Sequence, residues 1–274
     1  VHGFIDRREF LSRASIFAIG SVTAASMLDA LNPQYAGAAE VSPDDRNLKI
    51  ESKVFRSPDD WNGYLVRPAY PAKKGKLPAV LVVHENRGRN PYVEDVARRL
   101  GLAGFIAFAP DGLTSFGGWP GNDDEGREMM KKLDRGEMIK NWIAAIKYLE
   151  RLQGVGSVGA VGFCYGGSVV NSLATQVSSL KAGVAFYGGA PDLAQVKNIK
   201  AEMQIHHGEK DARLLAGAPA YEAALRASGV KFESYIYQDA LHGFHNNTTP
   251  RYDETAAQLA WQRTVQFLRS RLDS

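Results

Sequence analysis

The chain has 274 residues, of which 45% are hydrophobic and 23% charged, a globular composition that is too apolar for a disordered chain. Lys and Arg (33) exceed Asp and Glu (30) by only three, and no basic stripe with interleaved aromatic residues occurs, so nothing points to a nucleic-acid partner. The single cysteine excludes an intrachain disulfide, a zinc ribbon and an iron–sulfur cluster. A globular α/β or all-β protein remains.

The first 38 residues look like a targeting segment. Arg7-Arg8 precedes Phe-Leu, a weakly apolar run covers residues 14–31, and Ala36-Gly37-Ala38 offers small residues to a signal peptidase. These features in this order predict a twin-arginine export signal, with the export machinery as a partner and a periplasmic or secreted location. The alternative is an amphipathic helix with a chance arginine pair. A stable membrane anchor is not expected, because the run is short and interrupted.

Residues 39–274 alternate between strand and helix patterns, which indicates one α/β domain. Apolar alternation or continuous β-branched runs predict strands at 48–55, 61–66, 79–83, 105–109, 157–163, 183–187, 203–206 and 232–237. Apolar residues at helical spacing predict helices at 91–103, 138–152, 168–176, 221–227 and 257–272.

The order of these elements predicts the sheet. The first two strands are joined by the turn-forming residues 57–60, which favours an antiparallel hairpin at the edge. The later alternation predicts a mostly parallel, doubly wound sheet with helices on both faces. The one long irregular stretch, residues 111–124, is rich in Gly and Asn, and such loops are often functional.

The most informative segment is Gly162-Phe163-Cys164-Tyr165-Gly166-Gly167, between a predicted strand and a predicted helix. This is the nucleophile elbow, Gly-x-nucleophile-x-Gly, with cysteine in place of serine. The turn is so tight that side chains two residues on either side would clash, and the helix N-terminus favours a thiolate. The alternative is a buried structural cysteine in a glycine-rich turn.

Candidate partners for Cys164 follow two later strands. Asp211 comes after the strand at 203–206, and His242 comes after the strand at 232–237. Nucleophile, acid and histidine therefore stand in α/β-hydrolase order at carboxyl ends of strands. His242 would act as the base on the thiol, and Asp211 would hold its tautomer and stabilise its cation. Taken singly, either residue would be an ordinary surface group.

These segments together resemble the dienelactone hydrolases, or carboxymethylenebutenolidase-like proteins, from about residue 45 to the end of the sequence. The matching pieces are His84-Glu85-Asn86-Arg87-Gly88, Ala109-Pro110-Asp111-Gly112-Leu113, the cysteine elbow, the loop with Asp211 and His242-Gly243-Phe244. The resemblance implies an α/β-hydrolase fold without a separate cap domain. It also implies cleavage of a lactone or enol ester through an acyl-thioester, with no metal or organic cofactor.

The resemblance also implies a role for Glu85 beside the thiol, in its activation. A carboxylate there disfavours a second negative charge, so the resting cysteine can stay neutral. The alternative is an ion pair between Glu85 and Arg87 or Arg89. In such folds the oxyanion hole consists of two backbone N–H groups, here those of Tyr165 and Asn86.

Substrate binding departs from the family pattern. Arg127 resembles the first of two arginines that hold a substrate carboxylate, and Trp119 is expected to border the pocket. The second arginine should lie four residues after His242, where this chain has Asn246. A bidentate clamp is not expected from Asn246, and spacing alone does not decide whether Arg251 replaces it. Arg127 is equally well explained as a solvated charge.

Two other function classes remain open. A metal-dependent hydrolase is disfavoured, because His206 and His207 are adjacent on a strand and point to opposite faces, and no His-Glu-x-x-His occurs. A non-catalytic binding protein on the same fold is the second alternative. We expect a small-molecule ester or lactone as substrate, no metal site, and a monomer or small homo-oligomer.

Overall fold

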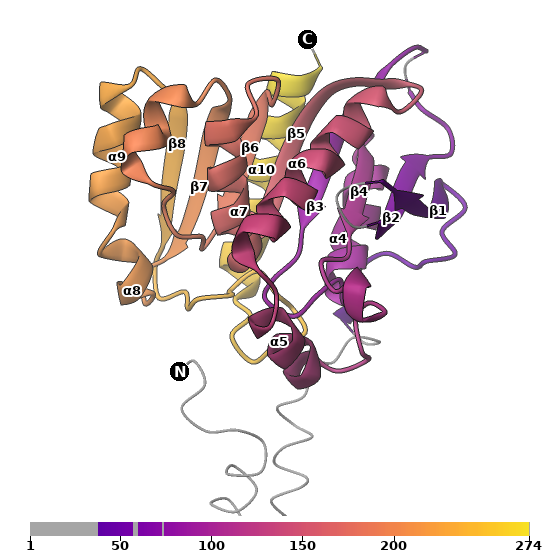
Figure 1. The fold of residues 1–274 in the computed structure, drawn as a ribbon, viewed down its shortest axis with the longest axis horizontal. Helices are drawn as coiled ribbons and strands as arrows, with labels where there is room; N and C mark the ends of the chain where they lie inside the picture. The colour runs from indigo at the N-terminus through magenta and orange to yellow at the C-terminus, as the bar shows by residue number, and fades with distance from the viewer. Residues whose placement is uncertain (1–37, 57–59, 73, 274) are drawn as a thin grey trace, which may run out of the picture.

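The computed structural model describes residues 38–56, 60–72 and 74–273. The predicted signal lies outside these residues except for its last residue, Ala38. Eight strands form one sheet in the order β1-β2-β4-β3-β5-β6-β7-β8 (Figure 1). They are β1 (Leu48–Phe55), β2 (Trp61–Pro68), β3 (Leu77–Val83), β4 (Ile106–Pro110), β5 (Val155–Phe163), β6 (Ala182–Phe186), β7 (Glu202–Gly208) and β8 (Phe232–Tyr237).

The sheet is parallel except at its N-terminal edge. β1 pairs antiparallel with β2, with Phe55 opposite Trp61, and β2 pairs antiparallel with β4. All other neighbours are parallel. The predicted edge hairpin and mostly parallel sheet are therefore confirmed. As a result, the carboxyl ends of β3, β5, β7 and β8 lie at the same edge of the sheet.

Helices cover both faces of the sheet (Figure 1). The main ones are α4 (Pro91–Leu102), α6 (Arg135–Arg151), α7 (Tyr165–Gln176), α9 (Ala218–Ala227) and α10 (Glu254–Leu272). β3 separates two buried clusters, since Leu81 and Val83 face α6 and α7 whereas Val80 and Val82 face α4 and α10. The two-residue alternation of a strand produces this division, and it explains why β3 has no exposed face.

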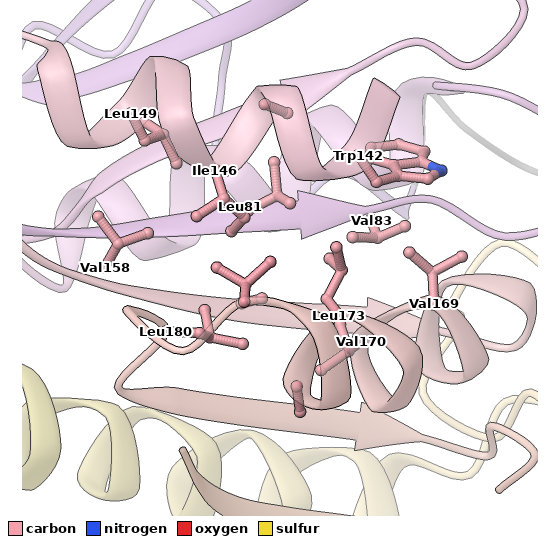
Figure 2. Close-up of a cluster of buried hydrophobic side chains, with 14 of the residues drawn as sticks. Leu81, Val83, Trp142, Ile146, Leu149, Val158, Val169, Val170, Leu173 and Leu180 are labelled. Atoms are coloured by element: carbon pink, nitrogen blue, oxygen red, sulfur yellow. The ribbon is translucent and has the colours of Figure 1, made fainter. Parts of the chain in front are cut away.

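Figure 2 shows the cluster on the α6–α7 side. Trp142, Ile146 and Leu149 of α6 meet Leu81 and Val83 of β3, with α7 on the other side. Trp142, Ile146, Leu149, Leu81 and Val83 are all fully buried. This packing fixes the end of β3 and the start of α7 against each other, which are the two places where the candidate site begins.

The predicted irregular stretch 111–124 is wrong in part. It contains the short helix η2 (Thr114–Phe116), and α5 (Asp123–Lys131) begins at its end. α5 is short and mostly polar, and the Asn122 side chain caps it by accepting from Glu125 N. The short helices η3 (Leu193–Asn198) and α8 (Ala212–Leu215) were also not predicted. α7 starts three residues before the expected 168.

No helix in the described part of the chain is both long and apolar enough to cross a bilayer.

Candidate active site

The elbow between β5 and α7 holds Cys164 in an unusual backbone conformation. Its φ is 56° and its ψ is −111°, a region that non-glycine residues occupy only when the surroundings force it. A Cβ on Gly162 would lie 2.1 Å from Gly166 O, and one on Gly166 would lie 2.2 Å from Val83 O. Glycine is therefore required at both positions because backbones cross there, as the elbow pattern predicts.

His242 lies between Cys164 and Asp211, within hydrogen-bonding distance of both. His242 Nε2 is 3.1 Å from Cys164 Sγ. His242 Nδ1 bonds to a carboxylate oxygen of Asp211 on its other side. All three residues come from loops directly after β5, β7 and β8, so the parallel sheet brings together residues up to 78 positions apart.

Electrostatics favour a charged histidine in this series. Burial by itself would lower the pKa of His242, but the hydrogen bonds to Asp211 and Cys164 and their charges outweigh it and raise the pKa to about 9. Burial would likewise raise the pKa of Asp211, yet the hydrogen bond and charge of His242 hold it below its ordinary value. This raised pKa favours the imidazolium form of His242, whose charge would stabilise a thiolate on Cys164.

Glu85 lies at the end of β3 and is 2% exposed. The two nearby arginines, Arg87 and Arg89, bind Asp123 at 2.5 Å and Glu94 at 3.1 Å, and Glu85 has a partner of its own. Its Oε2 instead accepts from Asn246 Nδ2 at 2.8 Å. Asn246 Oδ1 accepts from Thr248 N and from the Thr248 hydroxyl, which fixes the orientation of the side-chain amide.

Asn246 occupies the position where the family pattern has a second arginine, and in the structure its side chain binds Glu85. It is fully buried, and its one amide group bonds to Glu85 and to Thr248. An asparagine that holds a glutamate has little left with which to bind a substrate carboxylate.

Two tyrosines near Cys164 and His242, Tyr187 and Tyr92, are not predicted as site residues from the sequence. The Tyr187 ring lies 5.0 Å from the His242 ring, and its φ is 37°. Burial, with the charges of Tyr92, Glu85 and Cys164, raises the pKa of Tyr187 well above its ordinary value. The Tyr92 hydroxyl bonds to His245 Nδ1 at 2.7 Å. A tyrosine directly after a buried strand was the available signal.

The side chain of Tyr165, the first residue of α7, is held away from its own amide. Its hydroxyl accepts from Trp142 Nε1 at 3.1 Å, and the Arg135 guanidinium lies 4.8 Å from its ring centre. The first N–H groups of a helix have no partner within the helix. Tyr165 follows β5 and the half-buried Asn86 follows β3, and these two strands are neighbours in the sheet.

The predicted substrate-binding residues both follow β4 along the chain, Trp119 in the loop after it and Arg127 on α5. Arg127 is half-buried and pairs with Asp124 at 2.9 Å. Trp119 is half-buried, and its backbone N–H donates to Asp111 Oδ2 at 2.9 Å. Arg251 instead covers Gly243, next to His242, since a Cβ on that glycine would meet the guanidinium at 3.3 Å.

The remaining histidines are separated as the strand geometry predicts. His206 is fully buried, and its two ring nitrogens face the Tyr237 hydroxyl and Gln204 Oε1. His207 lies instead beside the charges of Asp211 and Glu222. Among the residues that the structure describes, no group of three or more His, Cys, Asp or Glu side chains is arranged to hold a metal ion.

Comparisons with known proteins identify the family of the chain. The model of the Dienelactone hydrolase family matches residues 61–272. An Escherichia coli protein named "Putative hydrolase fragment YghX" is 53% identical over 116 residues, covering 41% of this chain and 97% of that protein. A Bradyrhizobium protein named "Probable 2-oxo-3-(5-oxofuran-2-ylidene)propanoate lactonase" is 32% identical over 225 residues, covering 75% of this chain and 88% of that one.

Solved structures agree on the fold. A structure titled as a putative dienelactone hydrolase from Klebsiella pneumoniae has a TM-score of 0.72 and 25% identity, covering 81% of this chain and 98% of that one. Dienelactone hydrolase from Anabaena variabilis has a TM-score of 0.67 and 21% identity, covering 83% and 100%. With an α/β-hydrolase sheet, an elbow at its centre and a family match over most of its length, this chain belongs to the dienelactone hydrolase family of carboxylic ester hydrolases.

Proposed function

We propose that the chain hydrolyses an ester or lactone with Cys164 as nucleophile, His242 as base and acid, and Asp211 as the residue that orients His242. The observation that carries this is the 3.1 Å contact between His242 Nε2 and Cys164 Sγ, with Asp211 on the other ring nitrogen. The positive φ of Cys164 also supports it, because strained backbone conformations of this kind are concentrated at functional sites.

In the acylation step the Cys164 thiolate attacks the carbonyl carbon, and the C–S bond forms as the carbonyl π electrons move to oxygen. The backbone N–H groups of Tyr165 and Asn86 stabilise this oxyanion. When the carbonyl re-forms, the bond to the alkoxy oxygen breaks. That oxygen takes the proton from His242 Nε2 and leaves as an alcohol, or stays attached to the acyl group if the substrate is a lactone.

Water completes the cycle. His242, now neutral, takes a proton from a water molecule, and the resulting hydroxide attacks the thioester carbonyl. Collapse of this second intermediate breaks the C–S bond, releases the carboxylic acid and returns the sulfur as a thiolate beside the imidazolium. The sum is one ester and one water converted to one acid and one alcohol, so no cofactor is needed for balance.

In this proposal Glu85 makes activation of the thiol depend on the arrival of substrate. Its buried carboxylate, held by Asn246 at 2.8 Å, is a negative charge that opposes a second one on sulfur. Substrate that displaces or screens this carboxylate would favour the thiolate when it is needed.

For the substrate we propose a small ester or lactone that lies against Trp119 and the α5 side, with Arg127 as the cation for a carboxylate. The lactonase name of the Bradyrhizobium relative supports a lactone. The ion pair that Arg127 makes with Asp124 is exposed, so a substrate carboxylate can compete for it.

Hydrolysis of p-nitrophenyl acetate tests the proposal. We expect Cys164→Ala to lower kcat at least about 1,000-fold, since the nucleophile is removed. The matched control is Ser168→Ala, which changes a hydroxyl on the same helix outside the triad. Equal activity of Cys164→Ala and the native protein would remove Cys164 as the nucleophile. Chelator-sensitive activity would instead favour a metal-dependent hydrolase.

We also propose that residues 1–38 direct export through the twin-arginine machinery to the periplasm or medium, and that residues 39–274 form the single hydrolase domain. The motif and its small-residue site support this. Replacing Arg7-Arg8 with Lys-Lys in the native host should retain the enzyme in the cytoplasm. An intact N-terminus on cytoplasmic enzyme with native arginines would contradict it.

A further inference from the structure

His84 is the last residue before Glu85 at the carboxyl end of β3, and no side chain in the site is more enclosed. It is 0% exposed. Its ring lies 6.1 Å from the Tyr165 ring in a stacked arrangement and 5.3 Å from Trp142 edge-on. None of the catalytic steps above uses it, yet it contacts the loop after β3, the loop after β4 and the start of α7.

Both ring nitrogens of His84 have partners, and the partners fix the tautomer. Nδ1 lies 2.6 Å from the Glu85 carbonyl oxygen, which can only accept, so Nδ1 carries the hydrogen. Nε2 lies 3.0 Å from Gly112 N, whose N–H can only donate, so Nε2 is the acceptor. A Cβ on Gly112 would lie 2.9 Å from Nε2, so glycine is what lets the amide approach the ring.

The carbonyl that His84 holds belongs to the peptide group whose N–H is that of Asn86. A peptide group is planar, and none in the described residues is cis. The Glu85 carbonyl and the Asn86 N–H therefore point in opposite directions, and fixing one fixes the other. The bond to the carbonyl also polarises the group and strengthens the N–H as a donor.

We propose that His84 is a positioning residue of the oxyanion hole: its Nδ1–H fixes the plane of the Glu85–Asn86 peptide and so aims the Asn86 N–H at the oxyanion. Gly112 N–H selects the ring tautomer that can donate. This inference rests on the proposed function, because it presupposes an acyl transfer at Cys164. Burial lowers the pKa of His84, which keeps the ring in its neutral form.

Two substitutions separate the two hydrogen bonds. In His84→Asn the side-chain amide can take the place of Nδ1 and still donate to the Glu85 carbonyl. In His84→Gln the side-chain oxygen can take the place of Nε2 and accept from Gly112, while the Glu85 carbonyl loses its donor. His206→Gln is the matched control, since His206 is also fully buried with both ring nitrogens bonded but lies within β7.

Each variant is measured in two reactions. Hydrolysis of p-nitrophenyl acetate needs an oxyanion hole, whereas alkylation of Cys164 by iodoacetamide needs the thiolate and forms no oxyanion. We expect His84→Gln to lower kcat by about 10- to 100-fold, the range of a misplaced catalytic group, with KM within about threefold. Its alkylation rate should stay within about twofold, and His84→Asn should recover most of kcat.

Several outcomes would overturn the inference. It fails if His84→Gln keeps the native kcat, if alkylation falls in parallel with hydrolysis, or if His84→Asn is no better than His84→Gln. It also fails if His206→Gln, which should lower only Tm, loses kcat equally. If His84→Gln does not fold, His84→Ala assayed well below its Tm removes the same donor. A native protein without Cys164-dependent hydrolysis overturns the proposed function itself, which is a different result.

Discussion

The proposed triad and α5 represent two ways in which this chain places charged groups near its candidate site. Asp211 and His242 are at most 9% exposed, and their partners come from different strands. On α5, Arg127 pairs with Asp124 three residues away, and both side chains are substantially exposed. The triad is therefore fixed by the whole sheet, whereas the arginine is fixed only by its own helix.

This difference separates chemistry from recognition. Buried, cross-strand pairs cost much to disturb, because removing one partner leaves a desolvated charge. An exposed pair within one helix contributes about 0.3–0.5 kcal/mol, so it can exchange partners when a ligand arrives. We therefore expect substitutions in the two regions to differ by orders of magnitude, and the predictions below run from the largest effect to the smallest.

The largest effect is expected for Asp211→Asn. An amide in place of the carboxylate removes the charge that stabilises the His242 cation and favours the wrong imidazole tautomer, so kcat for p-nitrophenyl acetate should fall about 10,000-fold. The control is Asp239→Asn, whose carboxylate is exposed and pairs with Lys210. A loss of less than about tenfold for Asp211→Asn would break the comparison with α5.

The next effect is the titration of His242 itself. Its pKa is raised from 6.5 to about 9, so the stability it contributes is fully present below about pH 6.5 and is lost as pH rises through about 9. In histidine-labelled NMR spectra we expect this value in the native protein and a lower one in Asp211→Asn. As the pH rises from 6 to 10, the free energy of unfolding measured in urea should fall more for the native protein than for the variant. Equal slopes would contradict the shift.

A third prediction concerns the elbow. Gly166→Ala would put a Cβ 2.2 Å from Val83 O, so the backbone must shift, and we expect a loss of about 3 kcal/mol in the free energy of unfolding. Gly217→Ala is the control, because the nearest atom to its Cβ is 3.8 Å away. Equal stabilities of the two variants in chemical denaturation would show that the elbow can relax.

Adjacent asparagines offer a fourth comparison. Asn246→Ala leaves the buried Glu85 carboxylate without the amide that binds it, which should cost about 2 kcal/mol. Asn247→Ala removes a half-buried contact to Ala38 O and an exposed one to Glu40, and it should cost less than about 1 kcal/mol. Thermal unfolding measures both losses. A larger loss for Asn247→Ala than for Asn246→Ala would contradict the bond between Asn246 and Glu85.

The smallest effect is expected on α5. Arg127→Ala should lower the preference for a carboxylated lactone over its neutral ester, measured as a ratio of kcat/KM, by about three- to tenfold, since one exposed cation is lost. Lys131→Ala, on the same helix and paired with Glu128, is the control. An unchanged ratio would remove Arg127 from substrate binding and direct attention to Arg251.

The strand ends could be predicted from the sequence because buried parallel strands have continuous apolar runs. Cys164 follows such a run in β5, whereas Asp211 and His242 follow the more polar strands β7 and β8, and parallel pairing brings all three strand ends to one edge of the sheet. The elbow was equally accessible, since a backbone crossing demands glycine at two fixed positions.

What the sequence does not reveal depends on partners that are distant along the chain. The bond from Asn246 to Glu85 spans 161 residues, and nothing in either segment signals the other. The tautomer of His84 can be assigned only once the structure shows the N–H of Gly112, 28 residues away, beside Nε2.

The crossing of Gly162 and Gly166 also limits how the site can change. Because backbones fill the space on either side of the elbow, the reacting atom can be exchanged without being moved. An oxygen in Cys164→Ser would occupy nearly the place of the sulfur, with the same histidine facing it. The difference in rate between thiol and alcohol would then measure the acidity and polarisability of one atom, with its surroundings held constant.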